Sequence, residues 1–500
     1  GVDTAWATGE SGSSPTSTVW DGTTISEPKQ VEGVYQISTG AELAWFAAKV
    51  NDGTVANANA VLTNDIDLGS KEWTPIGITR SNSYKGNFDG QNHSIKNLLI
   101  TKENKGSIGI FGRIDSGSTI QKLTVVGKIE LSVAEKTFYI GGICGYARGN
   151  FIQCHNKIDI TVTAEQVGTY VGGICGFLAD NSKGGYEYQT YDEEKAFFIE
   201  GCENSGSISC KGTPGNEKSN TITIAGIVGS LSCSKVSASR NAGDVSAVLT
   251  GPGTAKYSGI TNAFDVSFTN INACYNTGKI AGSLEGTNAG VLRGAIVGVR
   301  NIASEYYPTH CSYLEGTAEA GICDANGTAI TGNERVALKT ETELKSEEFL
   351  TSLNNIDTIT GYKSTWTAGS DGYPQVSSAS KLEGIKSFVV AGVSATIDRA
   401  TKLITATLPE GTDLTNLTPT IACFGNAAVS PGSGVAQDFS KDVRYAVGDL
   451  TYTVKLSVAQ PIFEGKGTKA EPYLISSARD LKALSDEYNQ NQVGGQAVLG

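Results

Sequence analysis

The segments YIGGICGY (139–146) and YVGGICGF (170–177) are almost the same eight residues, and they decide the fold. The same skeleton returns in SIGIFGRI (107–114), TIAGIVGS (223–230), YSGITNAF (257–264) and RGAIVGVR (293–300). Aligning the six segments gives one column of isoleucine: Ile110, Ile143, Ile174, Ile227, Ile260 and Ile296. Repeats of this length indicate one supersecondary unit per copy, which buries its apolar face against its neighbours. The six isoleucines are therefore predicted to form a continuous buried ladder.

A column of small residues lies two positions after the isoleucines. Its members are Gly112, Gly145, Gly176, Gly229, Asn262 and Gly298. Glycine and asparagine adopt a positive φ more easily than other residues do. We therefore expect this column to form a corner of each repeat.

A second motif follows the first, in LTVVGKI (123–129), CHNKIDI (154–160), CENSGSI (202–208), SRNAGDV (239–245) and CYNTGKI (274–280). It gives a column of Leu123, Cys154, Cys202, Ser239, Cys274 and Cys311, and two residues on a column of Val125, Asn156, Asn204, Asn241 and Asn276. Matching at alternate positions is the period of a strand. We predict an all-β chain whose repeats wind into a right-handed parallel β-helix, a solenoid. The asparagines should stack as an inner or corner ladder in which each amide bonds to the next.

The ten cysteines need no chemical role in this arrangement, because most of them fall in the repeat columns. A buried thiol packs as a small apolar side chain, so reduced and unmetallated cysteines are predicted. Disulfides between neighbouring repeats remain an alternative, although stacked side chains that point the same way are poorly aimed for one. A metal site is the least favoured alternative, and no cofactor is expected.

The pattern G-x-x-G-x-x-G followed by C-x-N-x-G-x-I resembles the GLUG repeat family of bacterial surface proteins, over roughly residues 31–378. VYQISTGAELAWFA (34–47), TNDIDLG (63–69), FDGQNHSIKNL (88–98) and DGYPQV (371–376) are similar to the blocks that flank such repeats. The resemblance implies a cell-adhesion or other large surface protein of a gut bacterium of the Bacteroidetes or Firmicutes. The last copy departs from the pattern, since Tyr313 and Glu315 replace Asn and Gly.

Four parts of the chain are predicted. Residues 1–30 are expected to be flexible, and 31–378 to form the β-helix, with short helices at 40–51 and 346–355 that cover its two ends. From 381 to 460 the glycine triplets stop, and short alternating strands predict a compact β-sandwich. The end of this part resembles the immunoglobulin-like modules of Bacteroidetes surface proteins, which implies a module of that kind. Residues 461–500 repeat the order of 34–51, an extended YLIS and then an amphipathic helix. They are expected to begin a second β-helix.

Charge and hydropathy exclude several classes of partner. A net charge of −12 disfavours binding to nucleic acid or to an anionic membrane surface. The sequence holds no run of about 18 apolar residues, so no membrane-spanning helix is predicted. We expect an extracellular, cell-surface monomer, and any lipid or wall anchor would lie in a segment outside this sequence.

The motifs that mark common active sites do not occur, so we expect no enzymatic activity. Asp65 and Asp67 lie in the TNDIDLG block, where a turn is the simpler interpretation, because a calcium site needs more oxygen ligands. The histidines are His93, His155 and His310. The last two lie on opposite sides of the cysteine column, so they are predicted to face away from each other and to form no catalytic dyad with a cysteine.

Binding is instead predicted in loops that leave the repeats. The insertion NSKGGYEYQTYDEEKAFF (181–198) carries Tyr186, Tyr188 and Tyr191, and a second candidate is the pair Tyr306 and Tyr307. Tyrosine is favoured at recognition surfaces because it brings a large contact area and one polar group, although a solvated loop without function is the simpler alternative. The expected partner is a glycan or protein of a host or microbial surface. The alternative function is a non-catalytic arm of a larger surface glycosidase or peptidase.

Overall fold

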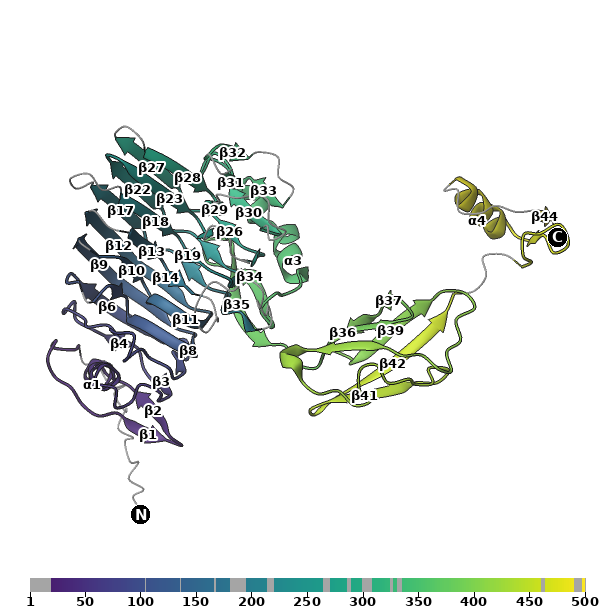
Figure 1. Ribbon diagram of the computed structural model, residues 1–500, viewed down its shortest axis with the longest axis horizontal. Coiled ribbons are helices and arrows are strands. Elements are labelled where there is room, and N and C mark those ends of the chain that lie inside the picture. The colour runs from purple at the N-terminus through teal and green to yellow at the C-terminus, as the bar shows by residue number, and fades with distance from the viewer. Residues whose placement is uncertain are drawn as a thin grey trace, which may run out of the picture. The chain divides into compact units, whose positions relative to one another are not determined.

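The structure is a computed structural model of the 500-residue chain. It describes residues 19–103, 105–134, 136–165, 168–179, 195–213, 220–263, 270–285, 289–298, 308–323, 327–330, 335–459, 464–489 and 497–499. The chain divides into two compact units, Gly1–Lys381 (unit 1) and Leu382–Gly500 (unit 2), and many of their helices and strands are labelled in Figure 1.

Most strands of unit 1 lie in three sheets, called A, B and C. Sheet A contains β1 (Lys29–Val31), β2 (Val34–Ile37), β3 (Ala60–Leu62), β5 (Phe88–Asp89), β8 (Phe111–Gln121), β11 (Cys144–Ile152), β14 (Cys175–Leu178), β15 (Phe198–Glu200), β19 (Val228–Leu231), β20 (Lys235–Ser237), β24 (Thr261–Ala263), β25 (Asn270–Asn272), β29 (Val297–Gly298), β31 (Ile322–Cys323) and β32 (Ala329–Ile330). Sheet B contains β4 (Ile66–Asp67), β6 (Ser94–Ile100), β9 (Thr124–Ala134), β12 (His155–Glu165), β16 (Glu203–Asn204), β17 (Ile208–Thr213), β21 (Arg240–Asn241), β22 (Val245–Thr250), β26 (Tyr275–Asn276), β27 (Ile280–Glu285), β30 (Cys311–Leu314) and β33 (Val336–Lys339). Sheet C contains β7 (Ser107–Ile108), β10 (Phe138–Gly141), β13 (Gly168–Gly172), β18 (Asn220–Ala225), β23 (Gly253–Ser258) and β28 (Ala289–Gly294).

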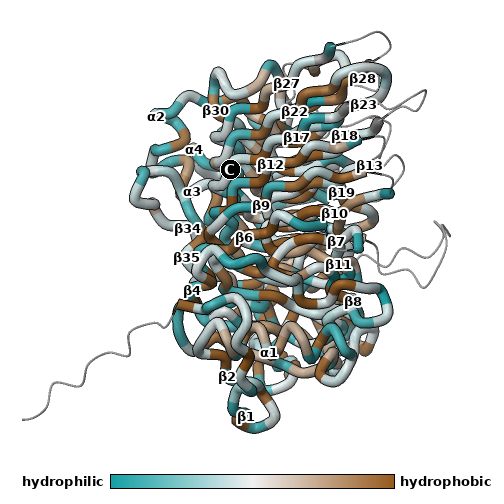
Figure 2. The backbone as a smooth tube through the Cα atoms, turned by 90° about the vertical axis from the view of Figure 1, so that its left-hand side faces the viewer, coloured by the Kyte–Doolittle hydropathy of each residue, from teal (hydrophilic) through white to brown (hydrophobic). Residues whose placement is uncertain are grey.

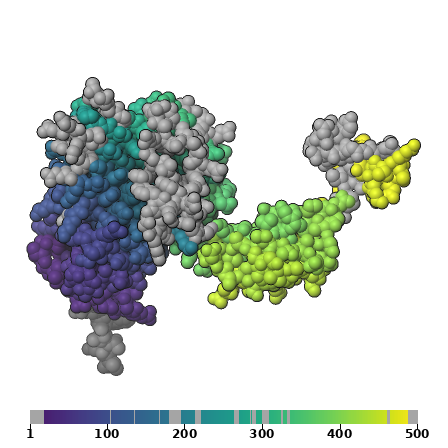
Figure 3. All heavy atoms as spheres, viewed as in Figure 1, coloured from purple at the N-terminus to yellow at the C-terminus, as the bar shows by residue number. Residues whose placement is uncertain are grey.

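Successive repeats place equivalent residues side by side in parallel strands. Cys144 pairs with Phe111 and with Cys175 in sheet A, and Asn156 pairs with Val125 and with Asn204 in sheet B. These partners are the ones that the alignment of the motifs predicts. Figure 2 shows β6, β9, β12, β17, β22 and β27 following one another in this order, and Figure 3 shows the same progression at the surface, from purple to green.

The isoleucine column lies at the centre of this unit. All six side chains are fully buried, with 0% of their surface exposed. The N–H of Ile174 donates to the carbonyl of Ile227 at 2.9 Å, and the N–H of Ile227 donates to the carbonyl of Ile260 at 3.2 Å. Burial of each such side chain contributes about 1.5–3 kcal/mol, so the column is a major part of the stability of unit 1.

The small-residue column does not form the predicted corner, because none of its members has a positive φ. A Cβ on Gly145 would lie 2.5 Å from the backbone nitrogen of Ile108, so close backbone approach selects glycine there. The positive φ angles, between 48° and 65°, lie instead one residue before the cysteine column, at Lys122, Gln153, Gly201, Ala238, Ala273 and His310. The sequence did not reveal this second position, because most of the residues that occupy it are types that seldom take a positive φ.

The asparagine column forms a hydrogen-bonded ladder inside the repeats. The Nδ2 of Asn156 donates to Oδ1 of Asn204 at 2.7 Å, Asn204 donates likewise to Asn241 at 2.8 Å, and Asn241 to Asn276 at 2.7 Å. All four side chains have 0% exposure. A second glycine of the first motif packs against each amide: a Cβ on Gly173, for example, would lie 2.5 Å from Cγ of Asn204. The ladder thus explains why the two motifs occur together.

The N-terminal end of the sheets is covered by α1 (Gly40–Asn51), in the range where the sequence predicts a helix. Thr39 and Glu42 form a capping box at its start, which satisfies two of its free N–H groups. Phe46 is fully buried, with its ring 5.7 Å from that of Tyr84. Trp20 falls in the segment expected to be flexible, yet it is 8% exposed and packs edge-on against Trp73. Burial of this large ring holds residues near it against the first strands.

The C-terminal part of unit 1 folds onto the outer side of sheets A and B. It comprises α2 (Glu341–Leu344), α3 (Glu347–Asn355) and the hairpin of β34 (Tyr362–Ala368) and β35 (Pro374–Lys381). The ring of Tyr275 lies 5.6 Å from that of Phe349 and 5.9 Å from that of Trp366. The helix predicted to lie beneath the final repeats therefore packs on their flank, because Tyr275 offers an outward aromatic surface there.

Unit 2 begins with two small sheets around a shared apolar core. One sheet contains β36 (Ile385–Val390), β37 (Val393–Ser394) and β40 (Thr420–Cys423), and the other β38 (Thr396–Asp398), β39 (Leu403–Leu408), β41 (Val443–Val447) and β42 (Leu450–Val458). Phe388 and Tyr445 belong to different sheets, and their rings meet at 5.5 Å. Both are buried, which gives this part a sandwich-like arrangement.

The last described segment repeats the order of the N-terminal one. β43 (Tyr473–Ile475), α4 (Ala478–Asn489) and β44 (Ala497–Leu499) follow each other, and the two strands pair in parallel. β2, α1 and β3 have the same order and the same parallel pairing. The likeness seen in the sequence therefore extends to the backbone.

Candidate functional site

The tyrosines predicted to bind a partner, Tyr186, Tyr188, Tyr191, Tyr306 and Tyr307, lie outside the described residues. The described part of unit 1 contains two side-chain clusters that sequence reasoning did not single out. One is a row of polar groups beneath the C-terminal hairpin. The other is a group of aromatic rings on the outer faces of sheets A and C.

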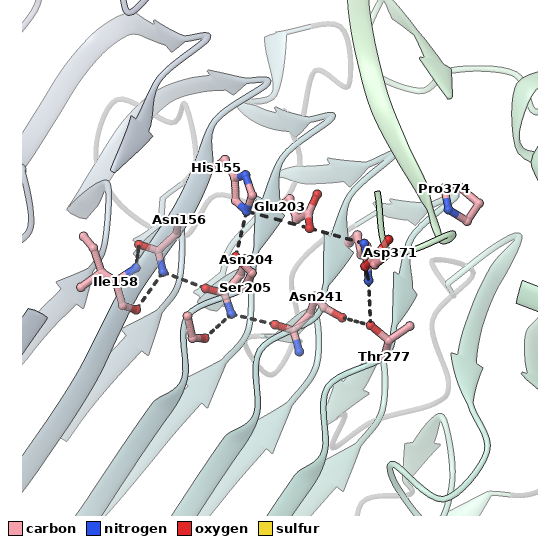
Figure 4. A network of polar contacts seen from close by, with 12 residues as sticks. His155, Asn156, Ile158, Glu203, Asn204, Ser205, Asn241, Thr277, Asp371 and Pro374 are labelled. Carbon is pink, nitrogen blue, oxygen red and sulfur yellow. Dashed lines mark hydrogen bonds and ion pairs between the residues drawn. The ribbon is translucent and has the colours of Figure 1, made fainter. Parts of the chain in front are cut away.

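The polar row consists of outward residues at the start of consecutive sheet B strands, His155, Glu203 and Arg240. Figure 4 shows His155 and Glu203 beside the inner asparagine residues. The Nη1 of Arg240 lies 3.5 Å from Oε1 of Glu203, and its Nη2 donates to Oδ2 of Asp371, in the hairpin connection, at 2.7 Å. The guanidinium also lies 4.8 Å from the ring centre of Tyr373. Arg240, which is only 4% exposed, thus joins the repeats to the hairpin.

Burial decides the protonation of this row. Burial, and then the charges of Lys157 and Arg240, lower the pKa of His155 to about 3. The ring is therefore neutral at pH 7, with Nε2 2.9 Å from Oγ of Ser205. Burial also raises the pKa of Glu203, an effect that Arg240 opposes. The imidazole and the carboxylate stand 3.9 Å apart, but each is engaged with neighbouring groups of unit 1.

A second buried carboxylate fastens the same hairpin. Glu200 is 1% exposed and accepts hydrogen bonds from Oγ of Ser364 at 2.5 Å and from Oγ1 of Thr360 at 2.6 Å. Burial raises its pKa, while these donors act in the opposite direction. A cavity of about 210 Å³ lies between the hairpin and the segment that carries Glu200 and Glu203. It is bordered by His155, Glu203 and Trp366.

The aromatic group comes from the two segments that define the repeat. Tyr139 stacks on Tyr170 with ring centres 5.4 Å apart, and Tyr146 stacks on Phe177 at 5.6 Å. The guanidinium of Arg113 lies 4.0 Å from the ring centre of Tyr146. The signal was present in the sequence, as the first and last letters of YIGGICGY and YVGGICGF, but the whole motif was assigned to packing. Because the ring faces contact one another, this group chiefly stabilises neighbouring repeats.

The acidic pair of the TNDIDLG block is occupied by local bonds. Asp65 accepts from the N–H of Ser94 at 2.8 Å and pairs with Lys96 at 2.9 Å, contacts that hold its pKa below the usual range. Asp67 accepts from the N–H of Gly69 and from Nδ2 of Asn97, both at 2.8 Å. Each acid therefore fixes a turn or a neighbouring strand.

The cysteine columns lie inside the repeats as free thiols. Cys144, Cys154, Cys175, Cys202, Cys274 and Cys311 are all buried. Burial raises the pKa of Cys175, Cys202 and Cys274 well above the usual value, so these thiols are protonated. Among the described residues, no group of three or more His, Cys, Asp or Glu side chains is placed to hold a metal ion.

A known protein family matches unit 2. Residues 385–459, which span both sheets of the sandwich, match the family described as SGBP, N-terminal. No curated protein matches the chain. The chain is similar to a solved structure of a "putative immunoglobulin A1 protease" from Bacteroides ovatus, at 18% identity and a TM-score of 0.44, over 71% of this chain and 95% of that one. At this TM-score the likeness does not establish a shared fold. No helix in the described part of the chain is long and apolar enough to cross a membrane.

Proposed function

We propose that this chain is a glycan-binding module without enzymatic activity, displayed on the surface of a bacterium of the Bacteroidetes type. The observation that carries the proposal is the match of residues 385–459 to the N-terminal family of SGBP, the surface glycan-binding proteins. In this proposal unit 2 acts as a spacer, and unit 1 supplies the binding surface. The partner is a glycan of a host or microbial surface.

In the same proposal, unit 1 is a right-handed parallel β-helix of the GLUG type. Support comes from the three parallel sheets, in which consecutive repeats contribute adjacent strands, and from the inward isoleucine and asparagine columns. Stacked repeats of this kind present long, rigid outer faces. Such faces suit the binding of an extended polymer.

A role without catalysis is favoured by how the buried ionisable groups are used. Arg240 contacts both Glu203 and Asp371, and Glu200 is bonded to Ser364 of the hairpin and to Thr360, just before it. General acid–base catalysis needs a group that can reach a substrate and exchange a proton with it. These contacts instead fasten the hairpin to the repeats.

The test combines binding and hydrolysis. The purified chain is run in affinity gels that contain single polysaccharides, and the same polysaccharides are incubated with it and assayed for new reducing ends. We expect retardation by at least one polysaccharide, without release of reducing ends. Release would show an enzyme, and an absence of retardation across a broad panel would contradict glycan binding.

A further inference from the structure

A polar groove of about 320 Å³ lies on the outer face of sheet A, near the N-terminal end of unit 1. One wall comes from the starts of β3 and β5 and the end of β8, and the other from Tyr362 at the start of β34. The side chains that matter are Asn59, Asn87, Asp89, Thr119, Gln121 and Tyr362. The volume is near the lower end of the range for small-ligand sites, roughly 300–1,000 Å³.

Two asparagine amides are held in a defined orientation along this groove. Oδ1 of Asn59 accepts from the N–H of Asn87 at 2.8 Å, and Oδ1 of Asn87 accepts from the N–H of Thr119 at 3.0 Å. Because a backbone N–H can only donate, the oxygen of each amide must face it. Among the described residues, neither Nδ2 group has a hydrogen-bond partner, and both side chains are exposed. Each amide therefore offers two fixed donors to solvent.

A third amide, that of Gln121, and the carboxylate of Asp89 also line the groove. The Nε2 of Gln121 donates to Oδ2 of Asp89 at 2.9 Å, while Oδ1 of Asp89 accepts from the N–H of Gln91 at 2.8 Å. This pairing turns Oε1 of Gln121 away from the carboxylate and leaves it as an acceptor. Donors and acceptors thus lie on adjacent strands, which are spaced about 4.8 Å apart.

Tyr362 supplies the accessible aromatic ring of this groove, because Phe88, which also borders it, is fully buried. Its ring lies 5.5 Å from that of Phe198, in β15. The next residue, Lys363, donates to the carbonyls of Asn354 and Ile356 at 2.7 and 2.6 Å, and Ser364 is bonded to Glu200. These contacts fix the start of β34, so the ring is positioned before any ligand arrives.

The charge of the lining selects the class of ligand. The described residues that line the groove include no lysine, arginine or histidine, and both oxygens of the single carboxylate, Asp89, already accept hydrogen bonds. Phosphate, sulfate and uronate groups would find no cation to pair with. Neutral hydroxyl groups, in contrast, match amides that both donate and accept.

We propose that this groove binds a neutral saccharide. Hydroxyl groups of the sugar bond to the side chains of Asn59, Asn87, Thr119 and Gln121, and the apolar face of a sugar ring packs on Tyr362. The inference rests on the proposed function, which it deepens by assigning a site and a ligand class.

The experiment uses the full chain in affinity gels with β-glucan, galactomannan, xyloglucan, α-mannan and the anionic polygalacturonate. The variants are Tyr362→Ala, Asn87→Ala and the isosteric Thr119→Val. The matched control is Asn150→Ala, since Oδ1 of Asn150 also accepts a backbone N–H of the next repeat, that of Phe198 at 3.1 Å, but lies outside the groove. Thermal melting of each variant verifies that it is folded.

We expect binding of a neutral polysaccharide to weaken about tenfold in Tyr362→Ala and severalfold in Asn87→Ala and Thr119→Val, with Asn150→Ala unchanged. If the parent binds a neutral polysaccharide and all folded groove variants bind it equally well, the groove assignment is overturned while the proposed function stands. Retardation by polygalacturonate alone would overturn the ligand class. Failure of the parent to bind any polysaccharide would overturn both proposals.

Discussion

Asparagine stacks twice in unit 1, once inside the repeats and once outside, and the two stacks use the amide differently. Inside, Asn156, Asn204 and Asn241 donate to the next amide as well as to a local carbonyl. Outside, Asn59 and Asn87 accept the N–H of the next repeat through Oδ1, and their Nδ2 groups have no partner among the residues that the structure describes. The inner amides have 0% exposure, whereas the outer ones face solvent.

The difference shows how one residue type can serve folding in one place and recognition in another. A buried amide must satisfy all its polar atoms, because an unpaired one costs about 1–3 kcal/mol. Water meets that requirement at the surface, so an outer amide can keep its donors free for a ligand. Burial therefore separates the structural stack from the candidate binding stack.

The largest effect is expected from breaking the inner stack with Asn204→Leu. This change removes the partner of Asn156 and of Asn241 and leaves buried polar atoms on both. We expect the free energy of unfolding to fall by about 3–5 kcal/mol, measured by urea denaturation. The outer change Asn87→Ala should cost under about 1 kcal/mol. Equal costs at the two positions would contradict the distinction between the stacks.

A similar contrast separates two arginines. Arg240 is 4% exposed between Glu203 and Asp371, whereas Arg113 lies over Tyr146 at a partly exposed position. Arg240→Met leaves the partly buried carboxylate of Glu203 without its partner, so we expect a loss of about 3 kcal/mol and faster amide hydrogen exchange in β34 and β35. Arg113→Met, as the control, should cost about 1 kcal/mol or less. Unchanged exchange in the hairpin would show that Arg240 does not fasten it.

The next effect is a dependence of stability on pH through His155. Burial and neighbouring cations lower the pKa of this ring to about 3 in the folded state, against about 6.5 in the unfolded chain. Above pH 6.5 the ring is neutral in both states. As the pH falls from 6.5 toward 3, only the unfolded state takes up the proton, so stability is lost.

We expect His155 to account for up to about 2 kcal/mol of the stability lost between pH 7 and pH 5, and this part of the loss should be absent in His155→Gln. Urea denaturation of both proteins at the two pH values measures it. His93→Gln serves as the control, because His93 lies at a partly exposed position beside Asp65, away from Arg240 and Lys157. If the free energy of unfolding falls equally between pH 7 and pH 5 in the parent and in His155→Gln, His155 does not cause this loss of stability.

The smallest effect on stability is expected from the inserted loop. Replacing Tyr186, Tyr188 and Tyr191 together by Ser should change the free energy of unfolding by no more than about half a kcal/mol for each residue. Affinity gels with the same polysaccharides then show whether the inserted segment or the groove binds the polysaccharide. Loss of binding in this triple variant, with the groove variants unaffected, would favour the loop.

The sequence alone determined the repeat, its register and its buried columns. Apolar burial and strand periodicity are local and recur in each copy, so an alignment of the chain with itself finds Ile143, Ile174 and Ile227, and also Asn156 and Asn204, without coordinates. The range of α1 was predicted for the same reason, because its capping residues and apolar spacing are all adjacent in the chain.

Only the tertiary structure decided which residues meet between distant segments. The contacts of Arg240 with Asp371, and of Phe198 with Tyr362, join residues more than 100 positions apart that share no repeat column. Similarly, the positive φ at Gln153 and Ala273 follows from the path of the whole repeat and not from local preference. The candidate groove depends on where the hairpin packs, and side-chain packing over that distance leaves no periodic signal in the sequence.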